Sequence, residues 1–104
     1  MKWFEDLYKR KICLTDERLK HIEIDHPEMS GQIDRIRKTL AEPDIIIRSR
    51  SDSEVELFYQ YYQSTPVGGK HMCVVVKDKG NYLFIITAYF TDTIKKGDIL
   101  WEKK

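Results

Sequence analysis

The apolar residues change their spacing at Pro43, and this change divides the chain into two parts. Before Pro43, apolar side chains recur about every three or four residues, the period of a helix that is buried on one side. After it, runs rich in β-branched and aromatic residues alternate with turn residues, which is typical of strands. This order predicts an α+β fold, with two or three N-terminal helices packed on one face of a four-stranded antiparallel meander sheet.

Two helices are predicted with clear boundaries. The first spans 16–25, because Thr15 is a good N-cap and Pro27 disfavours helical conformation in the residue before it. The second spans 30–42 and ends at the next proline. Residues 1–14 have a weaker pattern, but four of their apolar residues stand at helical spacing, which predicts a short third helix.

Four strands follow, and their ranges are 44–50, 54–62, 70–77 and 82–91. The fourth is the most apolar, so we expect it at the centre of the sheet. The apolar tail that includes Trp101 is expected to fold back onto the body. The second face of the sheet should then stay partly open.

With 104 residues, the chain is predicted to form one domain, 1–104. It has no apolar run near the roughly 20 residues of a membrane span and no secretory signal at its start, so we expect a cytoplasmic protein with two reduced cysteines. The net charge of only +1 excludes the strong overall field of a very basic nucleic-acid binder. The basic residues are clustered instead, in patches that bind phosphate or simply face solvent.

Two histidines are candidates for acid–base chemistry. His21 has Glu17 four residues before it and Asp25 four after, and a neighbouring carboxylate favours the imidazolium. His26 stands at the helix end, where a capping role competes with catalysis. Their five-residue spacing separates them by about 140° on a helix, which argues against a shared metal ion. We therefore predict no metal site.

Alternation along the strands predicts that their polar groups share faces. We expect Arg48 and Arg50 on the face of Ile46, Tyr59 and Tyr61 on that of Leu57, and Thr87, Tyr89 and Thr91 on that of Leu83 and Ile85. If these faces coincide, the groups converge on one patch. Arginine binds phosphate in a bidentate manner, and tyrosine stacks on unpaired bases.

An ordered set of motifs then suggests a family. The set comprises Leu19-x-His21-Ile22, His26-Pro27-Glu28, Pro43-Asp44, Phe58-Tyr59, Val74-Val75-Val76-Lys77 and Thr87-Ala88-Tyr89-x-Thr91. Over about residues 15–101, by pattern rather than identity, it resembles the phage and polymorphic-toxin branches of the barnase–EndoU–colicin–RelE-like nuclease superfamily. The chain departs from that superfamily in being nearly neutral and in having Asp25 where a basic residue is expected.

The resemblance implies a toxin-like, metal-independent endoribonuclease that cleaves RNA through attack by the 2′-OH and needs no cofactor. The residues implied as catalytic are His21, His26, Arg48, Thr87 and Tyr89. Those implied as substrate-binding are Arg50, Tyr59, Tyr61, Lys77 and Thr91. The expected partners are RNA and a cognate inhibitor protein. The alternatives are a catalytically inactive protein-interaction module and an RNA-binding module of the same fold.

Overall fold

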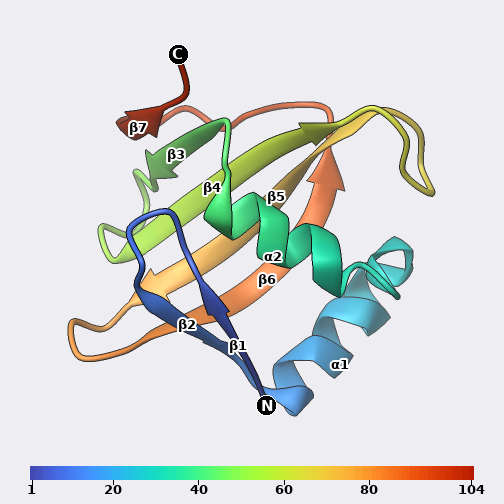
Figure 1. Ribbon diagram of the computed structural model, residues 1–104, viewed down its shortest axis with the longest axis horizontal. Coiled ribbons are helices and arrows are strands. Elements are labelled where there is room, and N and C mark those ends of the chain that lie inside the picture. The colour runs from blue at the N-terminus through green and yellow to red at the C-terminus, as the bar shows by residue number, and fades with distance from the viewer.

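The computed structural model describes all residues, 1–104, as a mixed α+β fold with two α-helices against a seven-stranded sheet (Figure 1). The sheet order is β1-β2-β6-β5-β4-β3-β7. The strands are β1 (Lys2–Glu5), β2 (Lys11–Leu14), β3 (Ile45–Arg48), β4 (Val55–Tyr62), β5 (Lys70–Asp78), β6 (Leu83–Thr91) and β7 (Asp98–Glu102). The helices are α1 (Asp16–Asp25), the short 3₁₀ helix η1 (Pro27–Met29) and α2 (Ile33–Ala41).

The two predicted helices are present, and their local signals explain their boundaries. The Thr15 hydroxyl accepts a hydrogen bond from the Arg18 amide at 3.1 Å, which caps α1 as predicted. Helix α2 is shorter than predicted, because residues 30–32 form a turn that follows η1, and the helix begins only at Ile33. The residues that α2 buries include Ile36 and Leu40, one turn apart on the face toward the sheet.

The predicted meander is also present, since β3, β4, β5 and β6 pair in sequence as antiparallel neighbours. The predicted sheet was nevertheless too small, and its centre was wrong. The middle strand of the seven is β5, not β6. Strand β6 pairs with β2 only through its first residues, in parallel, at Leu83 and Phe84. The remainder of β6 is an edge, against which α1 and η1 pack.

The N-terminal segment is a β-hairpin, so the third helix predicted there was wrong. The Asp6 carboxylate accepts hydrogen bonds from the Tyr8 and Arg10 amides and so closes the turn between β1 and β2. Side chains then alternate across the hairpin, and Phe4 and Ile12 are buried beneath α2 and the sheet core. Tertiary burial has overridden a weak local helical pattern.

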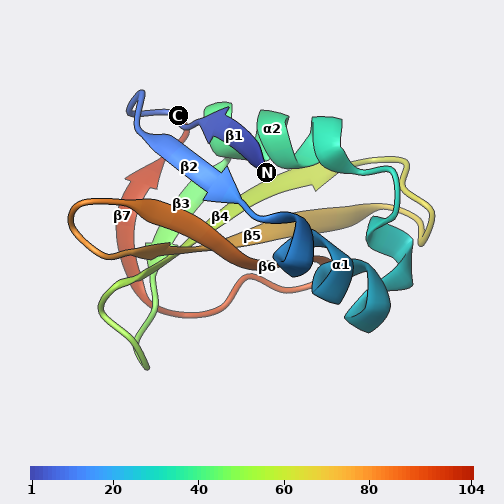
Figure 2. The ribbon, with the colours of Figure 1, turned by 90° about the horizontal axis from the view of Figure 1, so that it is seen from below.

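The C-terminal tail folds back as predicted, but as a seventh strand. Strand β7 pairs antiparallel with β3, from Ile45 opposite Glu102 to Arg48 opposite Asp98. To reach β3 from β6, residues 92–97 cross the sheet on the face that the helices leave free (Figure 2). We call residues 92–97 the strap and this face of the sheet the open face.

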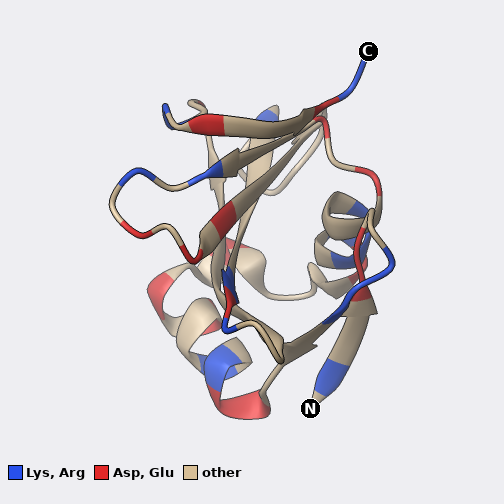
Figure 3. Ribbon diagram, turned by 90° about the vertical axis from the view of Figure 1, so that its left-hand side faces the viewer, with Lys and Arg blue, Asp and Glu red and all other residues tan.

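The two faces of the sheet carry separate apolar clusters. Fifteen buried residues form the core between sheet and helices, whereas five form a smaller cluster on the open face. The five are Ile47, Val55, Leu57, Tyr59 and Cys73. Charged residues of both signs are interspersed over the rest of the molecule (Figure 3). No helix combines the length and apolar character needed to span a membrane.

A bulge in β6 corrects one predicted face. Val75 is opposite Thr87, but the next residue, Val76, is opposite Ile85, so Ile86 is an extra residue. The extra residue reverses the alternation along β6. Ile85 therefore faces the helix-side core, whereas Thr87 faces the open face, and the expectation that they share a face was wrong.

Candidate active site

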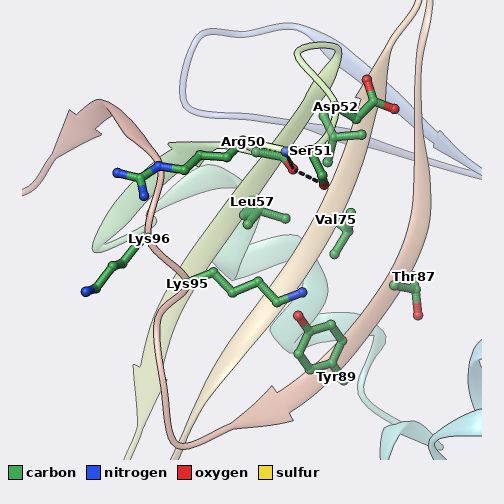
Figure 4. A pocket seen from close by; sticks show the side chains of 11 residues that line it. Arg50, Ser51, Asp52, Leu57, Val75, Thr87, Tyr89, Lys95 and Lys96 are labelled. Carbon is green, nitrogen blue, oxygen red and sulfur yellow. Dashed lines mark hydrogen bonds between the residues drawn. The ribbon is translucent and has the colours of Figure 1, made fainter.

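A cavity of about 380 Å³ opens on the open face, between the strands and the strap (Figure 4). Its lining comes from four separate parts of the chain: Ser49, Arg50, Ser51, Asp52, Val55, Leu57, Val75, Thr87, Tyr89, Lys95 and Lys96. The strand register places Leu57, Val75 and Thr87 side by side, and this row forms part of the floor. The cavity thus has a largely apolar floor and polar walls, the arrangement of many small-ligand sites.

The walls carry an excess of positive charge. Arg50, Lys95 and Lys96 have no ion-pair partner, whereas the single lining carboxylate, Asp52, is 2.8 Å from the Lys77 ammonium. Figure 4 shows Arg50 and Lys96 on the rim away from Tyr89, and Lys95 extending across the cavity toward the Tyr89 hydroxyl. In a chain of net charge +1, this local excess favours an anionic ligand here.

The strap that supplies the two lysines is held at defined points. The Lys95 amide donates a hydrogen bond to the Tyr59 hydroxyl at 3.1 Å. Gly97 lies so close to the Arg48 carbonyl and the Ile47 side chain that a Cβ atom would collide with both. These contacts fix the backbone on either side of Lys96, so both lysines are presented from an ordered segment.

A row of buried polar groups supports this arrangement. Tyr59 is opposite Cys73 across β4 and β5, and Cys73 is opposite Tyr89 across β5 and β6. Burial raises the pKa of the Tyr89 hydroxyl above its usual range and that of the Cys73 thiol to about 11. Both groups therefore keep their protons near neutral pH. Tyr89 can donate a hydrogen bond to a ligand oxygen, whereas Cys73 is not activated as a nucleophile.

His26 places an imidazole beside the cavity, in contact with the Tyr89 ring. It caps the C-terminus of α1, and its ring centroid lies 5.5 Å from that of Tyr89. Its Nδ1 is 3.7 Å from a carboxylate oxygen of Glu28, within ion-pair range when the ring is protonated. The Glu28 carboxylate therefore faces the Nδ1 side of the ring, and Nε2 is the nitrogen left for a ligand. The packing of α1 and η1 against the free edge of β6 thus positions His26.

The structure brings together three of the predicted site residues in the cavity lining, Arg50, Thr87 and Tyr89, and places His26 beside the cavity against the Tyr89 ring. It separates His21 and Arg48 from them. His21 is 56% exposed, lines no cavity and has only Glu17 near it, at 3.8 Å. Arg48 borders a different hollow among acidic residues on the helix side, so the expectation that it shares a face with Arg50 was wrong.

The remaining predicted residues are near the site, but their side chains have other contacts. Tyr59 is fully buried, and Lys77 pairs with Asp52 and with Glu54. The Thr91 hydroxyl bonds the backbone of Thr93 at the start of the strap. Tyr61 is exposed on the open face, beyond the cavity.

Sequence reasoning missed three residues that now belong to the site: Glu28, Lys95 and Lys96. The lysine doublet is visible in the sequence as a basic cluster, but only the pairing of β7 places it over the sheet. Glu28 is part of the His-Pro-Glu motif, and η1 turns its carboxylate back toward His26. In both cases the residues can be recognised in the sequence, but the tertiary contact that brings them to the site cannot.

Groups of three or more metal-ligating side chains do not occur in the structure. Comparisons of the chain with known protein families, with curated proteins and with solved structures find no match.

Proposed function

We propose that the chain is a metal-independent endoribonuclease whose active site is the open-face cavity. The observation that carries the proposal is the meeting of two hydroxyls and an unpaired ammonium in one cavity, Thr87, Tyr89 and Lys95, with the His26 imidazole beside it against the Tyr89 ring. RNA matches this chemistry, because its phosphates need cations and its unpaired bases suit an apolar floor. The resemblance in sequence motifs points to the same reaction.

The proposed reaction is an internal transfer at phosphorus. The ribose 2′-oxygen forms a bond to the adjacent phosphorus while the bond to the 5′-oxygen breaks, leaving a 2′,3′-cyclic phosphate and a 5′-hydroxyl. The 2′-oxygen loses a proton and the 5′-oxygen gains one, so no other reactant is consumed. The protein needs a proton carrier and groups that stabilise the extra negative charge at phosphorus.

We assign the proton transfer to His26, with Glu28 as the residue that orients it. Lys95 would stabilise the negative charge, and the Thr87 and Tyr89 hydroxyls would position the phosphoryl oxygens. This assignment replaces His21, whose side chain lines no cavity. We also propose that this activity is cytoplasmic. An acidic inhibitor protein would find its complement in the unpaired cations of the rim.

A second candidate function is RNA binding without cleavage. It is favoured by the single imidazole at the cavity, because the two proton transfers of the reaction commonly use two groups. A module of this kind would hold RNA through the same cations and aromatic rings. A protein-interaction module would use the same surface to bind a protein partner and would not retain RNA.

The test is cleavage of end-labelled single-stranded RNA by fresh protein in excess EDTA, with product ends identified by mass spectrometry. We expect cyclic-phosphate ends, and His26→Ala should reduce the rate about 10²–10⁴-fold. His21→Ala is the matched control on the same helix and should cleave at the wild-type rate. Intact RNA after long incubation refutes the ribonuclease. Salt-dependent retention of that intact RNA supports the binding module instead.

A further inference from the structure

The open face continues beyond the cavity in a second row of aromatic and polar side chains. Tyr61 is opposite His71, and His71 is opposite Thr91, two residues along the strands from the row that contains Tyr89. Side chains two residues apart on a strand share a face, at a spacing of roughly 7 Å. The row therefore lies directly beside the proposed site.

Tyr61 offers a fixed aromatic surface in this row. Tyr61 is 50% exposed, and its ring meets the His71 ring edge-on, with the two ring centroids 5.2 Å apart. The tip of the ring rests against Gly69, where any Cβ atom would collide with the hydroxyl. Packing on one edge and at the tip holds the ring while much of it stays open to solvent. Such a ring can stack on an unpaired base at low entropic cost.

His71 adds an unexplained polar group. Its Nδ1 is buried and has no hydrogen-bond partner. A buried nitrogen without an acceptor is less costly as a bare lone pair than as an N–H, so the proton belongs on Nε2. The His71 ring then presents Nε2–H as a hydrogen-bond donor beside the Tyr61 ring. Oxygen and nitrogen acceptors on the edge of a base are its natural partners.

We propose that Tyr61 and His71 form a second subsite, which takes the next unpaired base beyond the two nucleotides that are joined by the phosphate at the cavity. The inference rests on the proposed function and narrows its substrate to single-stranded RNA longer than a dinucleotide. Duplex RNA is excluded as a substrate, because its bases are already stacked and paired. The neighbouring unpaired cations, Arg50, Lys95 and Lys96, supply the charge complementarity for the phosphates.

Fluorescence anisotropy with labelled 2′-O-methyl oligonucleotides tests this subsite. These probes lack the attacking hydroxyl, so binding is measured even if the protein cleaves RNA. Tyr61→Ala should weaken binding of a hexanucleotide about tenfold or more and leave a dinucleotide within about twofold. Tyr61→Phe keeps the ring and should bind both probes like the wild type. Tyr82→Ala is the matched control, because Tyr82 is 52% exposed but stacks on Phe84 elsewhere.

The outcomes separate this inference from the proposed function. If RNA is cleaved but Tyr61→Ala binds the hexanucleotide like the wild type, the subsite is refuted and the ribonuclease stands. If Tyr61→Ala shows the length-dependent loss but RNA stays intact, the subsite stands and cleavage is refuted. Equal weakening by Tyr61→Ala and Tyr82→Ala refutes the subsite. Failure of the wild type to bind either probe refutes the subsite, whereas the proposed cleavage is judged by the assay in excess EDTA. Thermal unfolding of each variant confirms that it is folded.

Discussion

Arg10 ties the N-terminal hairpin to the sheet, and its replacement by methionine tests how strongly. Its Nε donates to Asp6 at 2.8 Å, and its two terminal nitrogens donate to Glu56 at 3.2 and 2.8 Å. The Asp6 and Glu56 side chains are 0% and 8% exposed. Removing the cation leaves two nearly buried carboxylates without a positive partner, which costs about 3–5 kcal/mol for a buried pair. Because Arg10 itself is 27% exposed, we expect about 3 kcal/mol.

The assay is urea unfolding followed by tryptophan fluorescence and by circular dichroism. A domain of this size has an unfolding free energy of about 5–15 kcal/mol, so the loss is large enough to measure. Arg18→Met is the matched control, because Arg18 is exposed and has no ion pair, and it should change stability by less than about 0.5 kcal/mol. A loss below about 1 kcal/mol for Arg10→Met refutes the reasoning, since an exposed ion pair contributes that much.

A second substitution separates the unpaired charge from lost packing. Adding Glu56→Gln to Arg10→Met removes one of the stranded charges while keeping the shape of the side chain. We expect the double variant to regain about 1 kcal/mol or more relative to Arg10→Met, although Glu56→Gln alone destabilises. Strictly additive losses in the two variants contradict the coupling between these residues.

Two further predictions concern the open face. Since the pKa of the Cys73 thiol is raised from 9.0 to about 11 in the folded protein, the unfolded chain releases this proton first. Stability should therefore fall by about 2 kcal/mol between about pH 9 and 11, and Cys73→Ala should flatten that part of the urea-unfolding profile; an unchanged profile in Cys73→Ala contradicts the assignment. Gly97→Ala should displace the strap, because the new Cβ would collide with the Arg48 carbonyl. We expect weaker RNA binding in a variant that is still folded, as its thermal unfolding would show. Wild-type affinity for RNA would show that the strap does not order the lysines.

The elements that were predicted well are those with signals inside their own segments. The first helix has the predicted bounds because Thr15 caps it and Pro27 ends it, and neither effect needs the rest of the fold. The N-terminal hairpin has no comparable signal. Its turn is closed by a side chain, Asp6, and it is anchored by Arg10 to a residue 46 positions away. A contact of that separation leaves no periodic trace in the sequence.

The bulge in β6 shows a second limit. The residues of β6 read as one continuous apolar run, so nothing in their order reveals that Ile86 is an extra residue. Because the alternation of side chains has a period of two, a single inserted residue transfers every later side chain to the other face. Thr87 and Tyr89 therefore reach the open face for a reason that only the pairing with β5 supplies.

The site itself depends on where β7 pairs. Strand β7 is four strands away from β6, or about 19 Å at 4.8 Å per strand, and Asp98 lies in the row of Ile85 rather than that of Thr91. The seven residue steps from Thr91 to Asp98 span at most about 25 Å. The strap must therefore cross the open face diagonally and nearly extended, with little slack. The same constraint holds Lys95 above the cavity floor, so the pairing of an edge strand orders the charge that the proposed reaction requires.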